Sequence, residues 1–178
     1  MITQEECEEL LISLQHVGRN CAYEHKADLK KIGTYLVYKK LAEANIRYLG
    51  CSYDGCGDSG EIEYLWVSNT SYIDDVTNEV EFFEDLNKPF SNLDPLDILF
   101  LTYNFSHYVN YEINSLDPSY LTLHRLFEAV LDFYIPAGFE INEGSFGSLE
   151  LDVQDKKINI YNNVRVTTTE FDSEEIDL

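Results

Sequence analysis

The chain of 178 residues has no long hydrophobic run. Its longest apolar runs, such as residues 98–101, are far shorter than the roughly 20 residues that a membrane span needs. The N-terminal segment MITQEECEELL has neither the basic start nor the apolar stretch of a secretory signal. We therefore expect no membrane association and a cytoplasmic location, in the cell that makes the protein or in the cell that hosts its gene.

Cysteine is sparse, and no two cysteines form a CxxC pair. Cys7, Cys21, Cys51 and Cys56 are too few for a disulfide scaffold in a chain of this length. The four histidines are not spaced around these cysteines as the ligands of a metal site would be. We expect reduced thiols that pack as small hydrophobic side chains rather than as zinc ligands.

Basic residues are scarce compared with acidic residues. The chain has 12 Lys and Arg against 33 Asp and Glu, which gives a net charge of −21. Residues 1–47 are balanced, with seven acids and seven bases, whereas residues 48–124 hold fourteen acids and one base, Lys88. The rest of the chain holds twelve acids and four bases. Such a field repels nucleic-acid phosphates and anionic membranes and attracts basic partners. We expect a basic protein surface as the partner and no direct nucleic-acid binding.

No internal repeat or long linker divides the chain, so we expect a single α+β domain over residues 1–171 and an acidic tail over 172–178. The capping box Thr3–Glu6 starts a first helix, and a second is expected over residues 28–44, ended by a left-handed Asn45. Asp-Pro pairs start two further helices, over residues 95–103 and 118–134. An alternating stretch is expected between them, at residues 108–114. Alternation predicts strands over residues 46–53, 61–67, 79–83, 148–153, 157–161 and 164–169, with turns at 154–156 and 162–163. The first two strands form a β-hairpin, and the last three form a C-terminal antiparallel β-meander.

The most distinctive motif is the glycine-rich acidic segment YDGCGDSGEIE at residues 53–63. It contains G-x-G-x-x-G, but a dinucleotide-binding loop opens into a helix, whereas a strand is expected here. It also contains GDSG, but the chain lacks the two β-barrels and the placed histidine of a chymotrypsin-like protease. As a calcium loop it fails, because Leu65 occupies the position of the closing glutamate. We expect an exposed acidic hairpin tip in which Ile62, Tyr64 and Trp66 share one strand face.

A second segment, residues 140–147 (EINEGSFG), repeats the pattern of acids leading into a glycine turn. If the C-terminal strands pair beside the hairpin, both segments lie at one edge of the sheet, although the sequence does not show that they meet. The candidate binding residues are those that carry polar or aromatic side chains in the two segments: Tyr53, Asp54, Asp58, Ser59, Glu61, Glu63, Glu140, Asn142 and Glu143.

Together the two segments resemble an uncharacterised family of small bacterial and phage proteins. That family carries YDGxGDSGxIE after an N-terminal helix, and an Asn-(Asp/Glu)-Gly-x-(Phe/Tyr)-Gly segment before a β-meander. The order of the segments and their flanking structure agree over about residues 25–170. This chain departs from the pattern at Cys56 and in an acidic middle over residues 68–118. The resemblance implies an accessory protein of bacteria, phages or mobile elements, and no defined activity.

Two functions are consistent with these features. The first is a non-enzymatic acidic interaction protein that binds a basic surface, for example as a nucleic-acid-mimicking inhibitor of a defence or nucleic-acid-handling protein. The second is a divalent-cation site, structural or catalytic, in which Asp54, Asp58 and Glu61 are the metal ligands. No histidine, lysine or cysteine is visibly placed as an acid, base or nucleophile, so catalysis has less support than binding.

Overall fold

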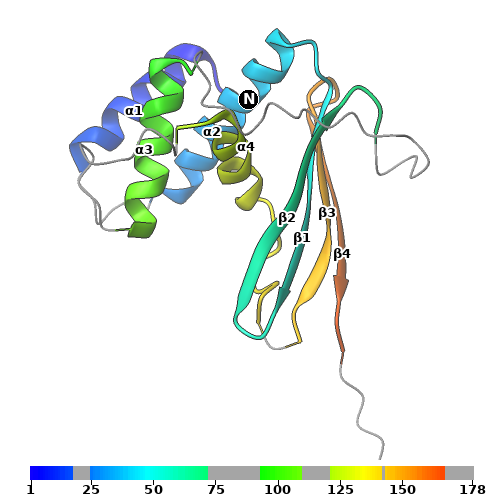
Figure 1. Ribbon diagram of the computed structural model, residues 1–178. Helices are drawn as coiled ribbons and strands as arrows, with labels where there is room; N and C mark the ends of the chain where they lie inside the picture. Colours follow the sequence, from blue (N-terminus) through cyan, green and yellow to red (C-terminus); the bar gives the residue numbers. More distant parts are fainter. Residues whose placement is uncertain (18–24, 72–92, 110–120, 142, 167–178) are drawn as a thin grey trace, which may run out of the picture.

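The computed structural model describes residues 1–17, 25–71, 93–109, 121–141 and 143–166. Within them lie helices and strands that confirm the predicted α+β class. The helices are α1 (Gln4–Val17), α2 (Lys26–Glu43), α3 (Pro95–Val109) and α4 (Leu123–Asp132). The strands are β1 (Tyr48–Cys56), β2 (Ser59–Ser68), β3 (Ser145–Asp152) and β4 (Lys157–Val164). Figure 1 shows the helices gathered beside one end of a long sheet, while the other end of the sheet projects beyond them.

The sheet has the order β2-β1-β3-β4, and every neighbouring pair is antiparallel. It consists of two hairpins, β1–β2 and β3–β4, that meet along β1 and β3. The first hairpin turns at Gly57-Asp58, where both residues have a positive φ, as a two-residue type I′ turn requires. The strands therefore extend into the glycine-rich segment, where the sequence predicted a turn between strands ending at residue 53 and beginning at residue 61.

Several helix boundaries follow local signals. The capping box is confirmed, since the Glu6 amide donates to the Thr3 hydroxyl and the Thr3 amide donates to the Glu6 carboxylate. Asn45 has the predicted left-handed conformation, with φ at 55°. Helix α3, however, continues to Val109, so the alternating stretch predicted from Tyr108 is wrong at its start, and its remainder lies outside the described residues.

The C-terminal strands differ from the prediction at Asn162-Asn163. These residues were expected to form a turn, but β4 continues through them because they pair with Gly147 and Phe146 of β3. Arg165 and Val166 follow β4 and belong to no strand. The rest of the predicted last strand, the strand predicted at 79–83 and the acidic tail lie outside the described residues.

A β-bulge in the first hairpin moves one predicted side chain to the other face. Ser52 pairs with Tyr64, but the next residue, Tyr53, pairs with Ile62, so that Glu63 is the extra residue of β2. Ile62 consequently packs against the core, whereas Tyr64 is exposed on the opposite face. The expected shared face of Ile62, Tyr64 and Trp66 is therefore wrong for Ile62.

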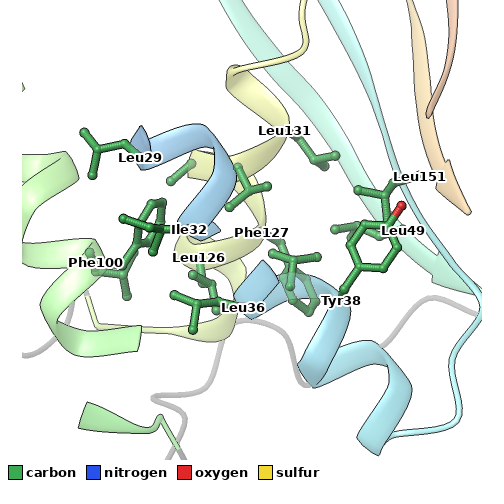
Figure 2. Close-up of a cluster of buried hydrophobic side chains, with 14 of the residues drawn as sticks. Leu29, Ile32, Leu36, Tyr38, Leu49, Phe100, Leu126, Phe127, Leu131 and Leu151 are labelled. Atoms are coloured by element: carbon green, nitrogen blue, oxygen red, sulfur yellow. The ribbon is translucent and has the colours of Figure 1, made fainter. Parts of the chain in front are cut away.

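The hydrophobic core lies between the helices and one face of the sheet (Figure 2). Leu29, Ile32 and Leu36 of α2 meet Phe100 of α3 at one end of the cluster, and the sheet closes the other end. Helix α4 contributes Leu126 and Phe127, while the sheet contributes Leu49 and Leu151. This packing fixes α4 against β1 and β2, which sets the position of the groove described below.

A buried ion pair joins α2 to α3. Asp97 is fully buried, and its carboxylate lies 2.7 Å from the ammonium of Lys40 and accepts the Asp94 amide at 2.7 Å. Burial raises the pKa of Asp97, although the hydrogen bonds from Lys40 and from that amide act in the opposite direction. The Asp94 carboxylate itself binds the ammonium of Lys39 at 2.8 Å. Asp94 therefore starts α3 as predicted, but its side chain anchors α2 instead of capping the helix.

Helix α4 begins at Leu123 and not at residue 118, because the Thr122 hydroxyl caps it by accepting the Arg125 amide at 3.2 Å. We expect Thr122→Ala to lower the free energy of unfolding by about 1 kcal/mol, the usual value of such a cap. Chemical denaturation measures this change. Thr122→Ser is the control, since it loses the same methyl group but keeps the hydroxyl. Equal stability of the two variants would show that the hydroxyl does not cap the helix.

Within the described residues, no helix is both long enough and apolar enough to cross a lipid bilayer.

Candidate functional site

The two glycine-rich segments of the sequence meet in the structure. Antiparallel pairing of β1 and β3 places Tyr53 opposite Gly147 and Gly55 opposite Ser145. Beyond the strands, the Asp58 amide donates to the carbonyl of Glu140 at 2.9 Å. The connection from α4 to β3 therefore runs along the projecting end of the first hairpin, as Figure 1 shows. The question that the sequence left open is answered: both segments form one end of the sheet.

The glycines at this junction allow close packing of backbone and ring. A Cβ atom on Gly55 would lie 2.7 Å from the Phe139 ring, and one on Gly60 would overlap the same ring. Gly144 has a φ of 73°, and a Cβ atom there would overlap the carbonyl oxygen of Gly55. The close contact between the two segments thus explains why glycine occupies these positions.

Tyr53 belongs to the core at this junction. Its ring is buried and lies edge-on to Phe139, with the ring centroids 5.6 Å apart. Its hydroxyl donates to the side-chain oxygen of Asn162 at 2.9 Å. Tyr53 was predicted as a binding residue, but its burial leaves no surface for a partner to contact.

Asp54 is neutralised by a residue that the sequence did not connect to it. The Arg165 guanidinium donates to the Asp54 carboxylate at 2.7 Å and to the Gly55 carbonyl at 2.8 Å. The hydrogen bond from Arg165 lowers the pKa of Asp54. The same guanidinium lies 4.9 Å from the centroid of the Phe146 ring. Asp54 is therefore part of a cation-bridged link between β1 and the end of β4.

The remaining acids of the two segments form a group that we call the hairpin-end patch: Asp58, Glu61, Glu63, Glu140 and Glu143. None of them forms an ion pair within the described part of the chain. All are exposed except the half-buried Glu140. The predicted Ser59 donates to the Cys56 carbonyl at 3.3 Å, while Asn142 lies outside the described residues.

Asp54, Asp58 and Glu61 were also predicted as ligands of a divalent cation. In the described ranges, no three His, Cys, Asp or Glu side chains are arranged so that they could hold a metal ion. Of the proposed ligands Asp54, Asp58 and Glu61, the first is engaged by Arg165. The divalent-cation hypothesis stays a prediction that no observation favours.

A groove of about 420 Å³ separates the edge strand β2 from α4. Glu61 of the hairpin-end patch lines one wall, and Glu128 and Asp132 of α4 line the other. The groove also contains Arg125, whose guanidinium lies 2.6 Å from the Glu128 carboxylate. Its apolar lining consists of Ile62, Ala129, Ile135 and Phe139. The groove is therefore an acidic cleft with an apolar floor.

Asn104 of α3 adds a polar group to this groove. It is only 8% exposed, and it lines the groove beside Glu128 and Asp132. The sequence did not point to Asn104, because the predicted helix ended at residue 103, one residue before it. The i, i+4 spacing of Glu128 and Asp132 on α4 is the signal that would have identified the acidic wall.

The described cysteines differ in their exposure. Cys7 and Cys51 are buried, as predicted, and burial raises their pKa values to about 11 and about 12. The carboxylates of Asp132 and Glu128 raise the pKa of Cys51 further. Cys56 is exposed, contrary to the prediction, and Cys21 lies outside the described residues.

Comparison of the chain with protein-family models, with curated proteins and with solved structures finds no match. The resemblance to an uncharacterised bacterial and phage family therefore stays a prediction.

Proposed function

We propose that the protein is a non-enzymatic interaction protein that binds a basic protein surface through the hairpin-end patch and the adjoining groove. The observation that carries this proposal is the junction of the two glycine-rich segments. It brings five carboxylates without ion-pair partners in the described structure beside a cleft that is also lined by Asn104, Asp132 and the ion pair of Arg125 with Glu128. Mutual repulsion of these carboxylates is relieved when a cation approaches, so a basic partner gains affinity from it.

The groove has the chemistry that an arginine side chain requires. Its apolar floor covers the methylene stem, while carboxylates at both walls accept from the guanidinium. The side-chain amide of Asn104, which lines the groove, offers a further acceptor. We infer that an arginine of the partner enters the groove and that neighbouring lysines or arginines contact the patch.

A surface of this kind competes with nucleic acid for a basic protein, because both present anionic groups to the same cations. The form of the function that we propose is a nucleic-acid-mimicking inhibitor of a defence or nucleic-acid-handling protein. It is supported by the net charge of −21 and by the concentration of acids after residue 47.

An arginine-rich peptide tests the patch directly. We expect its affinity for the protein to fall at least tenfold between about 50 mM and about 500 mM salt, because screening shortens the reach of exposed charges. We expect the double variant Glu61→Gln, Glu63→Gln to weaken binding about tenfold, as the loss of two charge-assisted contacts implies. Isothermal titration calorimetry measures both effects.

The matched control is the double variant Glu5→Gln, Glu9→Gln, which removes the same charge from exposed positions of α1. We expect it to change the affinity less than threefold, since these residues are remote from the groove. Equal losses in the two double variants would mean that net charge, and not the patch, attracts the peptide. Affinity that does not change with salt would contradict the proposal.

A further inference from the structure

A second groove, of about 790 Å³, lies at the opposite end of the sheet from the hairpin-end patch. Its walls are the start of α1, one side of α2 and the turn between β3 and β4. Ile2, Ala27, Tyr38 and Ile158 contribute apolar surface to it. Volumes of this size are typical of sites for small organic ligands.

This groove gathers lysines that form no ion pair with any described carboxylate. Of the ten basic residues in the described part of the chain, six form ion pairs, and the other four are Lys26, Lys30, Lys156 and Lys157. Lys30 and Lys156 line the groove, and Lys26 lies one turn before Lys30 on α2. In a protein with 33 acids, unneutralised bases at one groove form a local positive field within a negative molecule.

Lys30 is held in place by neutral groups. Its ammonium donates to the Phe133 carbonyl at 3.0 Å and lies 3.7 Å from the centroid of the Tyr134 ring. The Tyr134 hydroxyl is in turn 2.7 Å from the Thr34 hydroxyl, and both side chains line the groove. Burial, with a smaller contribution from Lys26, lowers the pKa of Lys30. An anion bound beside Lys30 would stabilise the charged form of its side chain, which burial disfavours.

The other charged groups at the groove leave the field positive. The Glu6 carboxylate is occupied by the capping box, where it accepts the Thr3 amide at 2.7 Å. Lys31 is paired with Asp28 at 3.1 Å. Lys156 is exposed on the β3–β4 turn with a φ of 54°, a conformation that glycine or asparagine adopts more readily than lysine. The ammonium groups of Lys30 and Lys156 are thus the two that an incoming anion meets.

We propose that this groove binds a small organic anion, a phosphate or carboxylate attached to an apolar or aromatic body. The anionic group contacts the ammonium groups of Lys30 and Lys156. The body of the ligand lies over the apolar surface of Tyr38 and Ile158. The site is independent of the hairpin-end patch, and its ligand has the opposite charge from the partner proposed there.

Three probes separate the contributions of charge and body: 1-naphthyl phosphate, which has both, inorganic phosphate and 1-naphthol. We expect 1-naphthyl phosphate to bind at least ten times more tightly than either of the others, because each of these lacks one part of the interaction. In amide-resolved NMR titrations, the shifts should saturate at Lys30, Lys31 and Lys156. Weaker or equal binding of 1-naphthyl phosphate, or shifts that map elsewhere, would overturn the proposal.

Variants test the two ammonium groups. We expect Lys30→Gln and Lys156→Asn each to weaken 1-naphthyl phosphate binding about tenfold, as the loss of one charge-assisted hydrogen bond implies. Asparagine is chosen at residue 156 because it tolerates the positive φ. Lys157→Gln is the control, since it removes the same charge from the neighbouring residue, which does not line the groove. Loss of affinity in Lys157→Gln equal to that in Lys156→Asn would show a general charge effect and would contradict the assigned site.

Discussion

Gly144→Ala, a substitution at the hairpin junction, is expected to lower the free energy of unfolding by about 3 kcal/mol or more. Two costs combine at this position. A side chain is strained at a φ of 73°, and the added methyl group would overlap the backbone of Gly55. The overlap is between the Cβ atom of residue 144 and the backbone carbonyl of Gly55, and neither can turn away as a flexible side chain would. The overlap is therefore removed only if β1 and the segment before β3 move apart. Urea denaturation measures the loss.

Gly57→Ala is the matched control for this prediction. Gly57 also has a positive φ, of 60°, but a Cβ atom there would have no neighbour within 4 Å. We expect a loss of about 1 kcal/mol, which is the backbone term alone. If Gly144→Ala costs no more than Gly57→Ala, the two segments are not in the close contact described. Gly144→Ala should also weaken the binding of an arginine-rich peptide, because the hairpin-end patch depends on the junction.

Lys40→Met is expected to lower the free energy of unfolding by about 3 kcal/mol at pH 7, because it leaves the buried carboxylate of Asp97 without its cation. Methionine preserves the length of the side chain, so packing changes little. Lys39→Met is the control on the same helix. Lys39 pairs with the more exposed Asp94, and its loss should cost less than about 1 kcal/mol.

The pH dependence of Lys40→Met identifies the cause. Burial raises the pKa of Asp97 in the folded protein, and removal of the lysine raises it further. A carboxyl group whose pKa is higher in the folded than in the unfolded state favours folding at low pH, and this contribution disappears as the pH rises through the folded pKa. The difference in stability between the variant and the wild type should therefore shrink as the pH falls from 7 towards about 4. A difference that stays constant over this range would mean that lost packing, not the unpaired carboxylate, destabilises the variant.

Local signals in the sequence predicted the fold class, the capping box at Thr3, the left-handed Asn45 and the first hairpin correctly. Each of these depends on residues close together in the chain. The errors arose where pairing between distant residues overrides a local signal. Asn162-Asn163 is a typical turn sequence, but pairing with β3 keeps it extended. The face of Ile62 depends on a bulge, which alternation within a single strand does not reveal.

The candidate site was predicted only in part, because it also depends on contacts between residues that are distant in the chain. The acids of the two glycine-rich segments are visible in the sequence, and the structure brings them together. The role of Asp54 was not predictable, because its partner Arg165 is 111 residues away. The groove was also missed, since it forms only where Asn104 of α3, Asp132 of α4 and Glu61 of β2 come together in the folded chain.

The arrangement of the sheet as two docked hairpins has a consequence for the order of folding. Each hairpin closes a short loop, but the β1–β3 pairing joins Gly55 to Ser145 and so closes a loop of about 90 residues. Contacts at such separation form slowly, so we expect β1 and β3 to pair after both hairpins exist. The entropy of closing a loop grows only with the logarithm of its length, at about 0.6 kcal/mol for each doubling. Apart from the parts that form α3 and α4 and pack in the core, the length of this loop therefore has little effect on the free energy of pairing β1 with β3.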